Sequence, residues 1–123
     1  MQIVALDHIQ LAMPAGQEEQ ARHFYENVMG FREVAKPEQL AARGGCWFER
    51  DGIHIHLGVM TDFRPATKAH PAFRVTDLER AQKTFLDADI SIIPDESLPH
   101  VRRFYVNDPF GNRIEIIQDG DVF

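Results

Sequence analysis

Four side chains able to bind a metal ion recur at matching places in two halves of the chain. His8 lies in "LDHIQLAMP", which opens the first half, and His70 lies in "KAHPAFRVTD", which opens the second. His56 in "DGIHIHLG" and Glu115 in "FGNRIEIIQD" close the two halves, each four residues after a glycine. Imidazole nitrogens and carboxylate oxygens are good ligands for divalent transition metals. Because the repeat places them in register, we predict that these four residues form a metal site.

Three further polar residues are expected beside these ligands and are predicted to contact substrate. His54 lies two residues before His56 on the same face of its strand, so it is also the alternative ligand. Arg103 and Tyr105 alternate with Phe104, and they face the same side as the ligands if Phe104 faces the core. An arginine there would suit an anionic substrate group, or it would form an ion pair at the rim of the site.

Regular elements must position these residues, and hydrophobic spacing predicts the same series of elements in both halves. Apolar and polar residues alternate in the strands, and an i, i+3, i+4, i+7 stripe marks one helix in each half. The first half is predicted to contain strands 3–13, 31–35, 46–50 and 53–59, a helix over 17–29, a hairpin turn at Asp51-Gly52 and a looser connection over 36–45. The second is predicted to contain strands 69–75, 90–93, 102–107 and 113–118, and a helix that begins at the capping box Thr76-x-x-Glu79.

The order βαβββ therefore occurs twice and predicts an α+β fold. Its modules are residues 1–60 and 70–123, joined by a linker over 61–69. A module of this size is marginal alone, so the two sheets should cooperate. Period-two alternation turns one set of apolar residues toward the helices: Ile9, Leu11, Ile53, Ile55, Leu57, Phe73, Val75, Ile114 and Ile116. The histidines of the strands and Glu115 point the other way, which makes that face a binding surface.

Composition narrows the class of protein. A chain of 123 residues provides one domain, and its net charge of −6 argues against nucleic acid as a partner. No apolar stretch approaches the roughly 20 residues that span a bilayer, and no basic leader precedes the first strand. The single cysteine, Cys46, fits a reducing compartment, so a cytoplasmic protein is expected.

Nearly the whole chain resembles the vicinal oxygen chelate superfamily. The resemblance is carried by "LDHIQLAMP", "FYENVMGF", "AHPAFRVTDLE" and most specifically "FYVNDPFGNRIEII". Members include glyoxalase I, methylmalonyl-CoA epimerase, extradiol dioxygenases, fosfomycin-resistance thiol transferases and bleomycin-resistance proteins. The resemblance implies two βαβββ modules forming a U-shaped mixed sheet with helices on the convex side. It also implies a divalent metal ion (Ni, Co, Zn, Mn or Fe) bound by His8, His56, His70 and Glu115. Glyoxalase I-like members more often carry a carboxylate or an amide at the position of His56.

The resemblance implies a metal-dependent lyase or isomerase of the glyoxalase I or epimerase type acting on a small-molecule substrate. Such an enzyme moves a proton next to a carbonyl through a metal-stabilised enediolate, and Glu115 would be the catalytic base. The alternative is an Fe(II) extradiol ring-cleaving dioxygenase, in which His8, His70 and Glu115 hold the metal and His56 is an acid or base. A third possibility is a metal-free ligand-binding protein of the bleomycin-resistance kind.

Each module supplies only two of the four ligands, so a complete site needs two modules. The linker between the modules is short, and in the family such chains form two-fold homodimers whose sites take ligands from both subunits. A homodimer is therefore expected, with a site built within one chain as the alternative.

Overall fold

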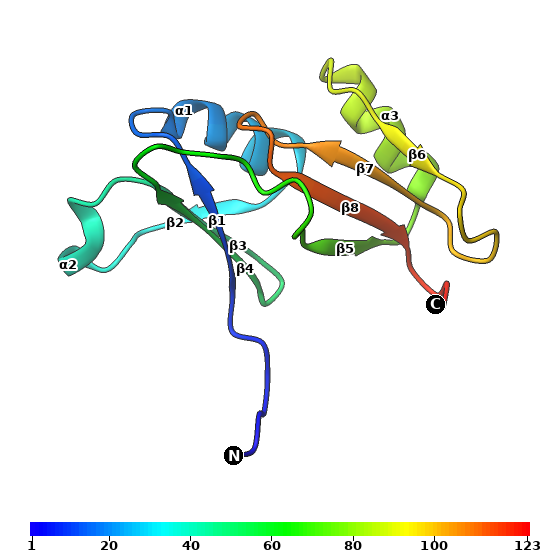
Figure 1. Cartoon of the computed structure of the whole chain (residues 1–123), viewed down its shortest axis with the longest axis horizontal. Coiled ribbons are helices and arrows are strands. Elements are labelled where there is room, and N and C mark those ends of the chain that lie inside the picture. Colours follow the sequence, from blue (N-terminus) through cyan, green and yellow to red (C-terminus); the bar gives the residue numbers. More distant parts are fainter. The chain divides into compact units, whose positions relative to one another are not determined.

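The computed structural model describes all 123 residues and divides into two compact units, Met1–Arg64 and Pro65–Phe123. Both units carry one four-stranded mixed sheet (Figure 1). The elements of the first unit are β1 (Ile9–Met13), α1 (Glu18–Ala21), the π-helical segment η1 (Arg22–Val28), β2 (Arg32–Val34), α2 (Glu38–Ala41), β3 (Cys46–Arg50) and β4 (Ile53–Val59). Those of the second are β5 (Ala72–Val75), α3 (Leu78–Asp87), β6 (Ile93–Asp95), β7 (Arg103–Asn107) and β8 (Arg113–Gln118).

The two sheets have the same topology, which confirms the predicted α+β fold of two βαβββ modules. Their strand orders are β1-β4-β3-β2 and β5-β8-β7-β6. In both sheets the first strand of the module lies parallel to the last, and the other neighbours are antiparallel. This pairing places the strand after His8 beside the strand that carries His56. It likewise places the strand after His70 beside the strand that carries Glu115.

The apolar faces of the strands form the cores of the two units. In the first unit Phe48, Ile55 and Leu57 are fully buried, and the ring of Tyr25 from η1 stacks on Phe48 with centroids 5.5 Å apart. In the second, Phe104 and Ile116 are neighbours on β7 and β8, and Phe85 of α3 packs edge-on against Phe104. The predicted faces hold along most of these strands. Ile53 is an exception, because it lies at the end of a hairpin and is exposed.

The first predicted strand is too long. β1 begins at Ile9, and the preceding residues form an extended tail that leaves the sheet (Figure 1). In the observed register Ile9 lies opposite Ile55 of β4, and β4 itself begins at Ile53. The chain before Asp7 therefore has no strand to pair with, and its apolar residues Met1, Ile3, Val4 and Leu6 are exposed.

Helix starts and short elements also differ from the prediction. The N-cap of α3 is Asp77, whose carboxylate accepts a hydrogen bond from the Arg80 amide, and not Thr76. The helix predicted over 17–29 changes from α to π at Arg22, so that the Met29 amide donates to the Phe24 carbonyl five residues earlier. This wider turn lets the consecutive rings of Phe24 and Tyr25 both enter the core.

One loop and two strands also differ from the prediction. The connection 36–45 contains the short helix α2. β5 begins at Ala72, after His70 rather than before it, and β6 lies at Ile93–Asp95, later than the predicted strand 90–93. The longest helix, α3, has ten residues, and none of the helices has the length and apolar character needed to cross a bilayer.

Candidate metal-binding residues and their surroundings

In the first unit, three aromatic rings stack on the face of the sheet opposite the core. His56 lies on β4, directly across from Trp47 of β3. The indole and the imidazole are parallel, with centroids 3.7 Å apart and an interplanar angle of 1°. The ring of His8 covers the other side of His56 at 4.1 Å and 20°. His56 is thus enclosed between two rings, and two of the predicted ligands are in contact.

His54 lies outside this stack. It sits opposite Glu49 near the hairpin end of β4 and is exposed. Its influence on His56 is electrostatic. Burial, together with the positive charges that His8 and His54 carry when protonated, lowers the pKa of His56 below its ordinary value of 6.5. His56 therefore favours its neutral form, which is the form that binds metal ions.

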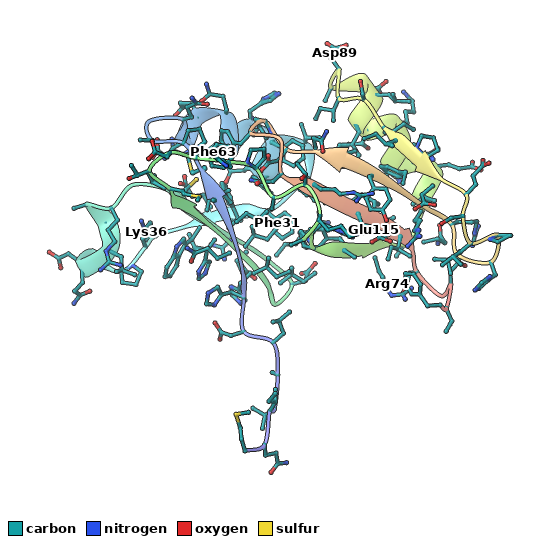
Figure 2. The ribbon with its side chains drawn as sticks, viewed as in Figure 1. Phe31, Lys36, Phe63, Arg74, Asp89 and Glu115 are labelled. Carbon is teal, nitrogen blue, oxygen red and sulfur yellow. The ribbon has the colours of Figure 1, made fainter.

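In the second unit, Glu115 lies on β8 (Figure 2). Its carboxylate connects a histidine to an arginine. Its Oε2 atom lies 2.9 Å from Nε2 of His70, and its Oε1 atom accepts a hydrogen bond from Nη1 of Arg103 at 3.0 Å. Glu115 is buried. Arg103 also forms an ion pair with Asp95 at 3.1 Å and donates to Ser97. Both carboxylate oxygens of Glu115 are therefore fixed by charged or polar partners.

His8 and His70, which the repeat makes equivalent, are held in the same way. Nδ1 of His8 lies 2.7 Å from the carboxylate of Asp7, and Nδ1 of His70 lies 2.8 Å from the Lys68 carbonyl oxygen. An oxygen atom at Nδ1 accepts a hydrogen bond from a proton there, so Nε2 of His8 is available as a lone-pair donor. Nε2 of His70 faces Oε2 of Glu115, and it would become available when a metal ion replaces that contact. Histidines that bind metals through Nε2 are oriented by hydrogen bonds of this kind.

Tyr105 of β7 lies between two arginines on the polar face of the second sheet. It faces Glu115 across the β7–β8 pair, and its ring meets that of His70 edge-on at 5.4 Å. The guanidinium of Arg113 lies over the Tyr105 ring at 3.8 Å, and that of Arg103 is 5.9 Å away. Burial, followed by the negative charge of Glu115, raises the pKa of Tyr105, so its hydroxyl stays protonated.

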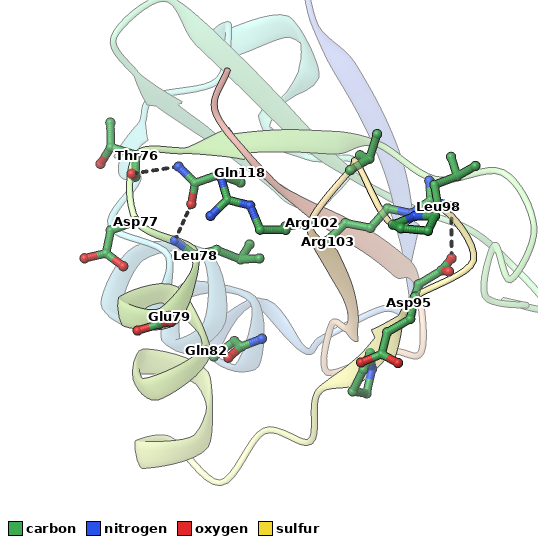
Figure 3. A pocket seen from close by; sticks show the side chains of 14 residues that line it. Thr76, Asp77, Leu78, Glu79, Gln82, Asp95, Leu98, Arg102, Arg103 and Gln118 are labelled. Carbon is green, nitrogen blue, oxygen red and sulfur yellow. Dashed lines mark hydrogen bonds and ion pairs between the residues drawn. The ribbon is translucent and has the colours of Figure 1, made fainter. Parts of the chain in front are cut away.

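A cavity of about 850 Å³ opens in the second unit beside the start of α3, and Arg103 lies in its wall (Figure 3). Gln118 spans one side, because its amide accepts from the Leu78 N–H and donates to the Thr76 carbonyl. The two arginines of the cavity are both paired: Arg102 with Asp121, and Arg103 with Asp95 and Glu115. A second cavity of about 450 Å³ lies in the first unit and is lined by residues of β2 and α2 and by Cys46. Burial raises the pKa of the Cys46 thiol to about 12, so Cys46 is an inert residue of the core.

The structure therefore brings the predicted ligands together in two pairs, His8 with His56 and His70 with Glu115. No group of three or more His, Cys, Asp or Glu side chains is placed for binding a metal ion. Of the residues predicted to contact substrate, Arg103 and Tyr105 lie beside Glu115, whereas His54 stands apart from the ring stack. Sequence reasoning missed Trp47 and Arg113. Trp47 could have been found from the Asp51-Gly52 turn, because a two-residue hairpin places Trp47 opposite His56.

Sequence and structure comparisons agree on the family. Residues 5–116 match the model of the Glyoxalase/Bleomycin resistance protein/Dioxygenase superfamily. Among curated proteins there is no match. The crystal structure of a protein from Bacillus anthracis, described as of the glyoxalase family, is 47% identical, with a TM-score of 0.91 over 96% of this chain and 97% of that one.

Two more distant structures share the fold. The fosfomycin resistance protein FosX from Listeria monocytogenes is 16% identical, with a TM-score of 0.77 over 95% of this chain and 94% of that one. A glyoxalase/dioxygenase from Nostoc punctiforme is 23% identical, with a TM-score of 0.73 over 98% and 99%. With its two βαβββ modules and a family match over most of its length, the chain belongs to the Glyoxalase/Bleomycin resistance protein/Dioxygenase superfamily.

Proposed function

We propose that this protein is a divalent-metal-dependent enzyme of the glyoxalase I or epimerase type that acts on a small molecule. Its metal ligands are His8 and His56 from the first unit and His70 and Glu115 from the second. The observation that carries the proposal is the shared arrangement of the two equivalent histidines, which both have Nδ1 held by an oxygen atom. The 47% identical glyoxalase-family protein supports the reaction class.

The spacing of the second pair fits a metal ion. Two ligand atoms that each lie about 2.1 Å from a transition metal, with a right angle between the two metal–ligand bonds, are about 3.0 Å apart. Nε2 of His70 and Oε2 of Glu115 are 2.9 Å apart, so a metal ion could take the place of the hydrogen bond between them. The first pair supplies imidazoles, and the lowered pKa of His56 keeps one of them neutral. The donor set of three nitrogens and one carboxylate suits Ni, Co, Zn, Mn or Fe.

When bound, the metal ion would act as a Lewis acid toward two adjacent oxygen atoms of the substrate. The residues of the chain then have distinct tasks. Glu115 would accept the proton from the carbon next to the carbonyl through the oxygen that faces His70, and that oxygen would have to leave the metal ion to do so. Arg103 holds the other oxygen and so fixes the direction in which the carboxylate points. Tyr105, protonated beside Glu115, would donate a hydrogen bond to a substrate oxygen.

One observation favours the ring-cleaving dioxygenase as a second candidate. His56 is packed between the rings of Trp47 and His8, which suits an acid or base beside the metal as well as a ligand. In this case the ligands are His8, His70 and Glu115, and the remaining positions of the metal are free for a catecholate and O2.

Metal analysis of the purified protein tests the proposal. After reconstitution, the protein should hold about one divalent ion per chain. His70→Ala should weaken binding by more than the roughly 10- to 100-fold that is usual for losing a residue that only supports a ligand. Metal content near zero in folded protein would contradict the proposal and leave a metal-free binding protein.

The matched pair His56→Ala and His54→Ala separates the two metal-dependent candidates. The single tryptophan, Trp47, lies on His56, so its fluorescence should report metal binding in the wild type. If His56 is a ligand, His56→Ala should lose metal affinity and His54→Ala should retain it. If both variants keep full metal affinity, the three-ligand dioxygenase is favoured. Activity toward a hemithioacetal and toward a catechol then identifies the reaction class.

A further inference from the structure

Arg113 differs from the other half-buried arginines in how its charge is compensated. Seven arginines are exposed, and only Arg22, Arg103 and Arg113 are half-buried. Arg22 pairs with Glu19 and Glu33. Arg103 pairs with Asp95 and Glu115. Arg113 forms no ion pair in a chain whose net charge is −6, although it lies only two residues from Glu115 on the same strand.

The Arg113 guanidinium is nevertheless held in a defined place. Its carbon atom Cζ lies 3.8 Å from the centre of the Tyr105 ring, a close cation–π contact. This contact leaves the N–H groups at the edge of the guanidinium free of a carboxylate partner. A flat guanidinium with unpaired N–H groups is suited to bind a carboxylate or a phosphate-like group through two parallel hydrogen bonds.

Arg103, the arginine that alternation in the sequence suggests for the same task, is unsuited to it. Its terminal nitrogens already bind Glu115, Asp95 and Ser97. Its Nε atom is buried without any hydrogen-bond partner. A substrate anion approaching Arg103 would also meet the charges of both carboxylates. Arg103 is thus a positioning residue for Glu115, and the guanidinium available to an anion is that of Arg113.

We propose that Arg113, held against Tyr105, binds an anionic group of the substrate, a carboxylate or a phosphate-like group, beside the His70–Glu115 pair. The protein would then act on small molecules that carry such a group close to the reacting carbonyl. The assignment of substrate class rests on the proposed function, whereas anion binding by Arg113 does not.

The two tyrosines of the chain provide the test. Tyr105 lies under Arg113, and Tyr25 is fully buried in the core of the other unit. In metal-free protein labelled at the tyrosine rings, titration with inorganic phosphate and separately with acetate should shift the Tyr105 signals saturably and leave those of Tyr25 in place. Arg113→Gln should weaken this response at least tenfold, and Arg113→Lys should weaken it less because charge remains without the planar fork.

Arg80→Gln is the matched control, since Arg80 is an exposed arginine of the same unit that forms no ion pair. It removes the same charge and should leave the titration unchanged. An equal response in wild type and Arg113→Gln, or an equal loss in Arg80→Gln, would overturn the assignment. Metal content measured on the same variants keeps the two proposals apart. If the wild type binds no metal but shows the Arg113-dependent shift, the anion site stands and the metal enzyme fails.

Discussion

At the scale of single residues, the Glu115 carboxylate depends on Arg103. Both side chains are nearly buried, with Arg103 12% and Glu115 5% exposed, and they are joined by a hydrogen bond of 3.0 Å. Removing one partner of such a pair leaves a charge without compensation in a place that water reaches poorly. The cost of that change is usually greater than the net contribution of the intact pair.

We therefore expect Arg103→Met to lower the free energy of unfolding by about 3 kcal/mol, measured by urea denaturation. The neighbouring Arg102→Met is the control. Arg102 is largely exposed, and its partner Asp121 keeps the hydrogen bond from the backbone N–H of residue 102, so the loss of this ion pair should cost about 1 kcal/mol or less. In a double-mutant cycle, Glu115→Leu should recover part of the loss caused by Arg103→Met. If the two arginine variants lose the same free energy of unfolding, the burial of the Arg103–Glu115 pair adds nothing to the cost of breaking it.

The pKa of His56 gives a second prediction at this scale. Because that pKa is lower in the folded protein than its ordinary value of 6.5, the unfolded chain binds the proton first as the pH falls. The contribution of His56 to stability is thus complete above pH 6.5 and is lost as the pH falls toward the folded-state pKa. Urea denaturation of metal-free protein between pH 7.5 and about 5 should show a smaller decrease for His56→Gln than for wild type. The exposed His23→Gln should behave as wild type does.

At the scale of elements, a glycine next to β3 limits how the first sheet can vary. Gly45 has φ +80°, and a Cβ atom built there would lie close to the Leu57 carbonyl oxygen of β4, at 2.1 Å. Gly52, in the hairpin turn, has φ +81° but nothing within 4 Å of such an atom. A side chain would therefore cause the strain of a left-handed backbone at both positions, but only at position 45 would it also collide with the Leu57 carbonyl oxygen.

Gly52→Ala should cost about 1 kcal/mol, the usual penalty for placing a side chain in the left-handed region. Gly45→Ala should cost several times more, because β3 and β4 must move apart to admit the methyl group. Thermal unfolding of the two variants measures the difference. If thermal unfolding shows the same loss of stability in both variants, the sheet relieves the close approach to Leu57 at no cost.

Sequence patterns predicted best the elements that end at a turn with a clear sequence signal. β3, β4 and β8 lie at the predicted residues, since a two-residue Asp51-Gly52 turn and the "DPFGN" turn define where strands end. β1 and β5 were predicted too long, because their lengths depend on the partner strands β4 and β8. The π-helical segment has no local signal of its own and follows from packing two consecutive rings against the sheet.

In the site, too, the features set by local sequence were predicted and those set by neighbouring strands were not. Alternation correctly placed His56 and Glu115 on the faces opposite the cores, because a strand period of two is a local property. The Trp47 ring on His56 depends on strand register, which the hairpin could have supplied. Alternation also placed Arg103 on the face of Glu115 and left an ion pair open as its role, but the diagonal pairing with Glu115 across β7 and β8 depends on strand register. The contact between Arg113 and Tyr105 depends on the direction of a flexible side chain, which no spacing in the sequence indicates.

At the scale of the whole molecule, each unit holds half of the proposed ligand set, so assembly decides the site. We expect a homodimer, and light scattering should report about twice 14.1 kDa. Mixing a His8→Ala chain with a Glu115→Ala chain should restore one intact metal site per heterodimer, because both lesions fall in one of its two sites and leave the other intact. Each variant alone should bind poorly. A monomer that binds one metal ion per chain would contradict the shared site and favour a site within one chain.

The position of β1 and β5 in their sheets has a consequence for how the protein opens. Both are edge strands, each hydrogen-bonded on one side only, whereas β4 and β8 have neighbours on both sides. Edge strands separate from a sheet in local fluctuations that leave the rest of the fold intact, and their amides exchange with solvent sooner. His8 and His70 directly precede these two strands. Amide exchange should therefore be faster in β1 and β5 than in the inner strands β4 and β8, and slow release of a bound metal ion would follow the opening of an edge strand rather than the unfolding of a unit.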